Sequence, residues 1–174
     1  MQTSTASTSS TPWQRTLLHG LVSGTLASLA SAAVLAIAGR GQDGHAAAPI
    51  NAVSHWVWPR RALVAERPSW KHTLTGLAIH QGAGLFWGVL YARLWGERVE
   101  AHDPARAMAG AVVASSVAAF ADFALTPDRF TPGYEHRVST GALVGAYAAF
   151  AVGLAAGSLL LAAQEEDPDF IMPR

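Results

Sequence analysis

Four apolar stretches dominate this sequence of 174 residues and set the range of folds that it can adopt. They cover residues 17–39, 73–95, 107–125 and 139–162. Each has about the length that a helix needs to cross roughly 30 Å of hydrocarbon. Only two charged side chains, Arg93 and Asp122, fall inside them, and all other charged residues lie between or outside them. This segregation predicts an all-α membrane protein, a bundle of four transmembrane helices.

The composition excludes several other classes of protein. Charged residues make up 14% of the chain, whereas a soluble domain has about a quarter. Twelve Lys and Arg balance twelve Asp and Glu, which argues against a nucleic-acid partner recognised through bulk positive charge. The chain has no cysteine, and therefore no disulfide framework, thiolate metal site or cysteine nucleophile. The predicted partner is the lipid bilayer.

The flanking segments divide the chain into three predicted parts. Residues 1–15 form a disordered arm rich in Ser and Thr, residues 16–163 form the membrane domain, and residues 164–174 form an acidic tail. A signal peptide is the competing interpretation of the first stretch. Its apolar core would be about 7–15 residues long, and residues 17–39 exceed that length. We therefore predict a retained membrane helix.

The long connection at residues 40–72 is predicted to carry a short interfacial helix over about residues 49–58. Pro49 suits a helix start and Pro59 a stop. Because nine or so residues cannot span a bilayer, this helix is expected to lie against the membrane surface. Aromatic side chains near the ends of the stretches are predicted interface anchors, namely Trp13, Trp56, Trp58, Tyr91 and Trp95.

An even number of spans places both termini on one side of the membrane. The loops at 40–72 and 126–138 then lie on the other side, with seven Lys and Arg against five on the side of the termini. That difference is too small to set the orientation by the positive-inside rule.

Small residues recur at every fourth position in all four stretches and predict close helix packing. The rows include Gly20, Gly24 and Ser28 in the first stretch, Gly84 and Gly88 in the second, Gly110 and Ala114 in the third, and Gly145, Ala149, Gly153 and Gly157 in the fourth. In lipid, close backbone approach supplies much of the attraction between helices. The same rows would also suit a homo-oligomer or a membrane protein partner.

Polar residues within and beside the stretches are predicted to gather near the end that carries the two loops. His80 and Asp122 fall on small-residue rows, which places them inside the bundle, and an ionisable group at such a depth needs a partner. The candidate polar cluster consists of His55, His80, Gln81, Asp122, Glu135 and His136.

Three interpretations of this cluster remain open. In the structural one, His80 and Gln81 bond to a neighbouring helix, Asp122 pairs with Arg129, Arg137 or a loop amide, and Glu135 caps the fourth helix. In the second, a divalent metal binds His80, Asp122, Glu135 and His136, or a haem binds two histidines, although His80 and His136 differ in depth by about two turns. In the third, the cluster moves protons or a cation.

The predicted function is structural or accessory, exerted through helix–helix contacts, with no catalytic residue and no cofactor. The alternative is a metal-binding or a proton- or ion-coupled membrane protein that uses the polar cluster near one membrane face.

Three features also resemble a family. They are the segment SHWVW at residues 54–58, His80 in the second stretch, and TPDRFTPGYEHRVS at residues 126–139 before a glycine-rich last helix. Over roughly residues 16–162 the layout resembles small bacterial inner-membrane proteins of the YagU-like group. The resemblance implies a multi-pass, four-helix protein of the bacterial inner membrane. It implies no activity and adds no catalytic residue.

Overall fold

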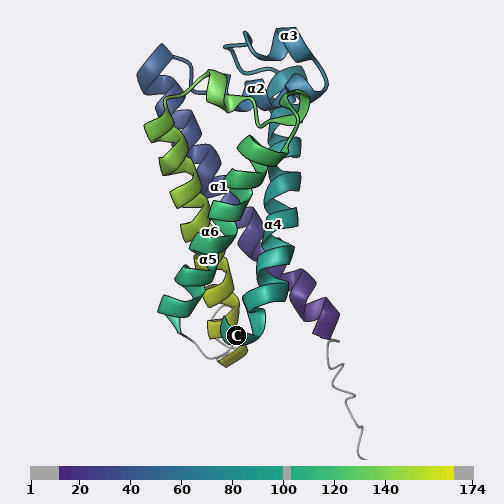
Figure 1. Ribbon diagram of the computed structural model, residues 1–174, viewed down its shortest axis with the longest axis vertical. Helices are drawn as coiled ribbons and strands as arrows, with labels where there is room; N and C mark the ends of the chain where they lie inside the picture. The colour runs from purple at the N-terminus through teal and green to yellow at the C-terminus, as the bar shows by residue number, and fades with distance from the viewer. Residues whose placement is uncertain (1–11, 100–102, 167–174) are drawn as a thin grey trace, which may run out of the picture.

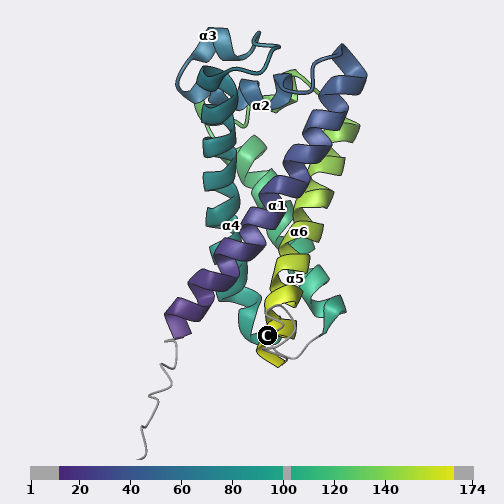
Figure 2. The same cartoon turned by 180° about the vertical axis from the view of Figure 1, so that it is seen from behind.

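The structure, a computed structural model, describes residues 12–99 and 103–166, and every regular element within these ranges is helical. Four long helices run along the molecule (Figure 1), namely α1 (Pro12–Asp43), α4 (Thr75–Val99), α5 (Pro104–Phe120) and α6 (Thr140–Glu166). Short elements gather at one end, namely α2 (Ala48–Val53), η1 (Ser54–Trp56), α3 (Pro59–Ala62), η4 (Asp128–Phe130) and η5 (Tyr134–His136). We call residues 44–72 and 126–139 the cap. The start of α1 and the last described turn of α6 lie at the end of the molecule away from the cap (Figure 2).

Three of the long helices are long and apolar enough to cross a membrane: Pro12–Asp43, Pro104–Leu125 and Thr140–Gln164. The second of these, Pro104–Leu125, continues α5 through the π-helical turn η3 (Ala121–Leu125). α4 has 25 residues and is preceded by a second π-helical turn, η2 (Trp70–Leu74). It is not among the three, and it carries His80, Gln81 and Arg93 along its length. The prediction of an all-α protein with apolar spanning helices is therefore confirmed at this coarser level.

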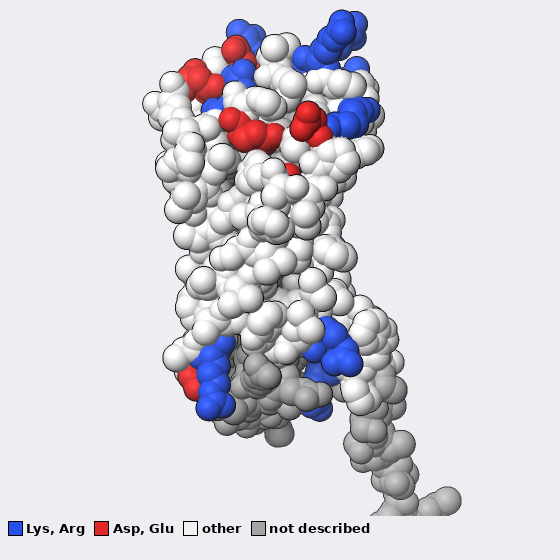
Figure 3. Space-filling model, in the orientation of Figure 1, with Lys and Arg blue, Asp and Glu red and all other residues white. Residues whose placement is uncertain are grey.

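The surface separates charge from apolar residues along the long axis. Figure 3 shows Lys, Arg, Asp and Glu gathered towards the two ends of the visible face, with a broad uncharged band between them. Large hydrophobic side chains of the long helices are exposed, including Leu29, Ile37, Phe86, Phe120 and Val144. An apolar band of this kind is what a bilayer would cover.

α1 lies between α4 and α6 and packs on each through a different row of small residues. Towards α4, Gly20 and Gly24 approach Gly84 and Gly88 so closely that a Cβ atom on Gly88 would lie 2.6 Å from the Cα atom of Gly24. The predicted close approach of small residues is observed at this crossing.

An adjacent row of α1 receives α6. A Cβ atom on Gly157 would lie 2.5 Å from the Cα atom of Ser23, and one on Gly153 would lie 2.5 Å from the backbone nitrogen of Ala27. The two helices therefore touch backbone to backbone. α5 differs, because its Gly110 makes room for the ring of Trp95 on α4, not for a neighbouring backbone.

The cap is held together by a buried amide. Asn51 on α2 is 0% exposed. Its Nδ2 atom donates hydrogen bonds to the carbonyl oxygens of Ala65 (2.9 Å) and Arg67 (3.0 Å), and its Oδ1 atom accepts one from Thr73 Oγ1 (2.7 Å). Asn51 thereby fixes the loop that leads from α3 into α4.

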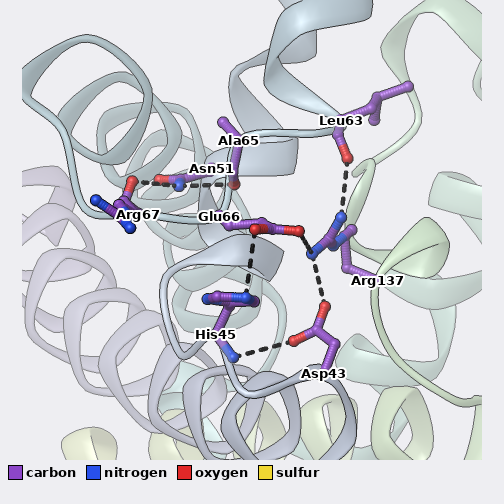
Figure 4. A network of polar contacts seen from close by, with 8 residues as sticks. All are labelled: Asp43, His45, Asn51, Leu63, Ala65, Glu66, Arg67 and Arg137. Atoms are coloured by element: carbon purple, nitrogen blue, oxygen red, sulfur yellow. Dashed lines mark hydrogen bonds and ion pairs between the residues drawn. The ribbon is translucent and has the colours of Figure 1, made fainter.

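An ionic network joins the two loops of the cap (Figure 4). Arg137 donates to Asp43 Oδ2 (2.6 Å) and to the carbonyl oxygen of Leu63 (3.3 Å), and lies 3.9 Å from Glu66 Oε1. Glu66 also lies 3.3 Å from His45 Nε2. These contacts tie residues 126–139 to the end of α1 and to residues 44–72.

Several predicted boundaries differ from the structure. α1 begins at Pro12, so the predicted arm is wrong for residues 12–15, while residues 1–11 lie outside the described part. Likewise, α6 extends to Glu166, into the predicted acidic tail, and residues 167–174 are not described. The extensions arise because helical hydrogen bonding does not stop where the apolar run stops.

The predicted helix over 49–58 is shorter than expected and is not amphipathic. α2 ends at Val53, a 3-10 turn follows, and all six residues of α2 are buried, including Asn51. The sequence pattern missed this because a placement against the membrane surface assumed an uncovered helix, whereas the rest of the cap buries it.

Two of the predicted interface anchors serve the interior instead. Tyr91 is 0% exposed and donates a hydrogen bond to the carbonyl oxygen of Ala107 (2.9 Å). Trp95 stacks on Tyr91 and packs against Gly110. Trp13 is exposed near the start of α1. Trp56 donates to the carbonyl oxygen of Thr131 (2.9 Å), and Trp58 lies edge-on to His72.

Candidate functional site

A small pocket lies between the four long helices, close to the cap. It has a volume of about 40 Å³, enough for a few water molecules. Its polar lining comes from Ser31 on α1, His80 on α4, Asp122 on η3, Tyr134 on η5 and Tyr147 on α6. Leu35, Ala118, Ala146 and Phe150 are among the apolar residues that complete it. The structure thus brings His80 and Asp122 to one pocket, as the sequence predicted.

One wall of the pocket is a directed chain of hydrogen bonds. The hydroxyl of Tyr147 donates to Asp122 Oδ2 (2.6 Å). Since that hydrogen is committed to the carboxylate, the Tyr147 oxygen accepts from the hydroxyl of Tyr134, 3.0 Å away. Ser115 on α5 also donates to the backbone carbonyl of Tyr147 (2.6 Å). Asp122 is therefore bonded to Tyr147, not to Arg129, Arg137 or a loop amide as expected.

A π-helical turn carries Asp122 at the end of α5. The backbone nitrogen and the hydroxyl of Thr126 both donate to the carbonyl oxygen of Ala121, at 2.9 and 2.8 Å. This wide turn closes α5 before Pro127, which cannot donate a backbone hydrogen bond. π-helical turns are often found at functional sites.

The facing wall belongs to α1 and α4. The Nε2 atom of His80 lies 3.0 Å from Ser31 Oγ and 3.2 Å from the carbonyl oxygen of Ser28. Because a carbonyl oxygen can only accept, Nε2 carries the hydrogen in the bond to Ser28. The rings of His80 and Tyr134 meet edge to face, with centroids 6.4 Å apart. The pocket therefore lies between His80 on one wall and Asp122 on the other.

Burial and two nearby carboxylates keep the hydroxyl of Tyr134 neutral. Burial raises the pKa of Tyr134, the nearby carboxylates of Asp122 and Glu135 raise it further, and its hydrogen bond with Tyr147 opposes them. A phenol held above its ordinary pKa of about 10 keeps its proton at neutral pH. Tyr134 therefore acts in the pocket as a hydroxyl donor.

The other members of the predicted cluster lie outside the pocket. Gln81 donates to Thr25 Oγ1 on α1 (2.9 Å). His55 is buried in the cap, with its Nδ1 atom 3.0 Å from the carbonyl oxygen of Ala52. Glu135 Oε1 lies 3.7 Å from His136 Nε2, so Glu135 pairs with its neighbour in sequence and does not cap α6 as expected.

The structure does not assemble the predicted metal ligands. Within residues 12–99 and 103–166, no group of three or more His, Asp or Glu side chains could hold a metal ion. His80 and Asp122 line the pocket, whereas His136 is an exposed side chain of the cap. The four residues His80, Asp122, Glu135 and His136 therefore do not share one site in the described structure.

Sequence reasoning missed Tyr134 and Tyr147. Tyr147 offered a signal, because it is the one phenol in the stretch 139–162 and Asp122 required a donor at its depth. Tyr134 follows Gly133, whose φ of +89° favours glycine. A Cβ atom there would lie 2.6 Å from His55 Nδ1. This tight turn directs Tyr134 into the bundle. It forms only in the folded cap, so the sequence pattern did not reveal it.

No family model, curated protein or solved structure matches this chain.

Proposed function

We propose that the chain is a four-span integral membrane protein in which α1, α4, α5 and α6 all cross the bilayer. α4 has 25 residues and would extend about 37 Å at 1.5 Å per residue. It lies alongside α1 in the apolar band, and its polar residues His80 and Gln81 are satisfied by α1. The cap lies at one interface and both termini lie on the other side. The localisation we propose is the bacterial inner membrane, in keeping with the YagU-like resemblance.

Within this topology the protein has a structural or accessory role that depends on fixed helix contacts. One observation supports this most strongly: polar side chains link the helices pair by pair. His80 and Gln81 join α4 to α1, Tyr91 joins α4 to α5, and Asp122 and Ser115 join α5 to α6 through Tyr147. Such bonds add little energy each in membranes, about 0.6 kcal/mol on average, but they set the register of the bundle.

Replacing Tyr147 with phenylalanine tests this role. The change removes the donor to Asp122 and the acceptor for Tyr134 while keeping the ring. We expect a loss of about 1–2 kcal/mol in the free energy of unfolding, measured by titrating the detergent-purified protein with a denaturing detergent. Tyr91→Phe, which loses hydrogen bonds only to neutral groups, the carbonyl of Ala107 and the hydroxyl of Ser158, is the matched control and should lose less. Equal stability of Tyr147→Phe and wild type would contradict the structural role.

A second candidate function, proton movement, is favoured by the pocket itself. His80 and Tyr134 face each other there without a direct hydrogen bond in the described structure, and the space between the walls can hold water. A carboxylate, two phenols and an imidazole around water are groups that can pass a proton.

Asp122→Asn separates the two functions. Asparagine keeps an oxygen that accepts from Tyr147 but cannot take up a proton. The assay uses reconstituted vesicles with an internal pH-sensitive dye and an imposed potassium diffusion potential. If the protein moves protons, the internal pH of these vesicles should change at a rate well above that of protein-free vesicles. The variant should lose that excess rate while staying folded. Wild-type vesicles no faster than protein-free vesicles would rule out proton movement and leave the structural role.

A further inference from the structure

The outer surface of the cap carries a group of basic side chains. Arg60 and Arg61 on α3, Arg67 after it, and Lys71 on η2 are exposed. None of the four makes an ion pair with an acidic residue in the part of the chain that the structure describes. Figure 3 shows basic side chains over the part of the cap where α3 lies.

The acidic residues of the network in Figure 4 are engaged elsewhere in the cap. Asp43 pairs with Arg137, and Glu66 lies between Arg137 and His45. Folding therefore directs these carboxylates to Arg137 and away from the cations on α3 and η2.

Two of the cations converge on one place. Lys71 Nζ lies 4.8 Å from the centroid of the Trp58 ring, and the same indole meets His72 edge to face at 5.3 Å. Burial lowers the pKa of His72, and the charges of Lys71 and then Arg61 lower it further. The charges of Lys71 and Arg61 therefore act on the same imidazole, and Lys71 also lies over the indole that this imidazole contacts.

The local fold holds this arrangement in place. Ser69 caps the π-helical turn that carries Lys71, accepting from the backbone nitrogen of His72 (3.0 Å). Ser54 Oγ lies 3.2 Å from His72 Nδ1. Ala62 on α3, beside Arg61, is 0% exposed and anchors that helix. A cation–π contact also restrains Lys71, so less entropy is lost when a ligand binds.

Large apolar side chains close to these cations in the sequence are exposed as well. Trp70 is 85% exposed and Val64 is 71% exposed, and Val57 next to Trp58 is exposed as well. An indole exposed beside lysine and arginine is typical of the membrane interface, where the ring lies at the level of the head groups. The combination of cations with apolar side chains matches the phosphate and the upper acyl chain of a lipid.

We infer that Arg61, Lys71, Trp58 and Trp70 form a binding site for the phosphate of an anionic phospholipid at the cap end of the protein. The guanidinium of Arg61 can grip two phosphate oxygens, Lys71 supplies a second charge, and Trp70 lies among the first methylenes. The inference rests on the proposed membrane topology, which sets the cap at an interface.

Lipid titrations of the full chain, followed by native mass spectrometry from detergent, test this site. The probes are dioleoylphosphatidylglycerol, which is anionic, and dioleoylphosphatidylcholine, which is zwitterionic. We expect preferential binding of phosphatidylglycerol. Arg61→Gln with Lys71→Gln should weaken it about 25-fold, since each cation near an anionic surface is worth about fivefold in affinity.

Single variants distinguish specific lipid binding at Arg61 from a general effect of positive charge on the protein. Arg61→Lys keeps the charge but loses the two hydrogen bonds that a guanidinium makes to one phosphate, so it should weaken phosphatidylglycerol binding, although less than Arg61→Gln does. Arg40→Gln removes an exposed arginine at the end of α1, on the other side of the cap from α3 (Figures 1 and 2). It should leave phosphatidylglycerol binding within twofold of wild type. Equal losses from Arg40→Gln and Arg61→Gln would overturn the site.

Competition with inorganic phosphate identifies the source of the anion. Little displacement of the lipid by millimolar phosphate supports the lipid site, and full displacement would make it a site for soluble anions and overturn the proposal. A folded protein that floats with vesicles yet shows no lipid preference overturns the lipid site alone. A protein that fails to float with vesicles overturns the proposed membrane topology with it.

Discussion

Gly88→Ala is expected to lose about 3 kcal/mol of the free energy of unfolding, because α1 and α4 cannot both keep their positions around one added methyl group. The new Cβ atom would fall against the carbonyl oxygen of Gly20 and 2.6 Å from the Cα atom of Gly24. These neighbours are backbone atoms, so no side chain can rotate away. Overpacking a tight contact costs about 1–3 kcal/mol, and a clash between two backbones belongs at the upper end.

Gly82 on the same helix provides the matched control. A Cβ atom there meets nothing within 4 Å, and alanine is the better helix former by up to about 1 kcal/mol. Gly82→Ala should therefore be neutral or slightly stabilising. Both variants are compared by denaturing-detergent titration of the purified protein. Equal stability of the two variants would show that the crossing of α1 and α4 is not the tight contact described here.

The second large effect is expected from Asn51→Asp, which keeps the size of the side chain and reverses part of its hydrogen bonding. The amide nitrogen of Asn51 donates to the carbonyl oxygens of Ala65 and Arg67. An ionised aspartate would place an acceptor against two acceptors at a site that is 0% exposed. Unpaired buried charges cost about 3–5 kcal/mol, so we expect a loss of about 3 kcal/mol or release of the loop at residues 63–69.

Limited proteolysis reports this release directly, because cleavage in the loop should accelerate at least tenfold while the long helices remain protected. Gln42→Glu is the control. Gln42 Oε1 accepts from the backbone nitrogen of Ser139 (2.7 Å) in an exposed contact, and glutamate retains that acceptor. Its cleavage rate should match that of wild type. A cap equally resistant in Asn51→Asp would contradict the role of Asn51.

The helices and their close contacts followed from patterns that are local in sequence. Apolar stretches placed the long helices, and the four-residue spacing of small residues placed Gly24 and Gly88 at an interface. His80 and Asp122 were identifiable because an ionisable side chain at that depth must find a partner. Each of these inferences concerns one helix at a time. The spacing of residues along the helix and the free-energy cost of an unpartnered ionisable side chain are enough to make them.

The partners of those residues could not be predicted in the same way. A tyrosine near the end of an apolar stretch reads as an interface anchor, yet the hydroxyl of Tyr91 turned out to satisfy a carbonyl on α5. Tyr147 bonds to Asp122 only because α5 and α6 meet at that height. The pattern around Pro49 placed a short helix against the membrane surface, and the structure buries all six residues of α2. Each of these outcomes depends on which distant segments meet.

The position of α1 between α4 and α6 has a consequence for how the protein is made. α1 leaves the ribosome before α4 and α6, and it carries two adjacent rows of small residues that receive these later partners. Its α6 face, which includes Ser23 and Ala27, has no matching surface until Gly153 and Gly157 have been synthesised. We therefore expect the bundle to close only when α6 has been made. In the proposed membrane topology, a chain stopped before α6 leaves that face open in the lipid, where quality-control proteases and chaperones recognise it.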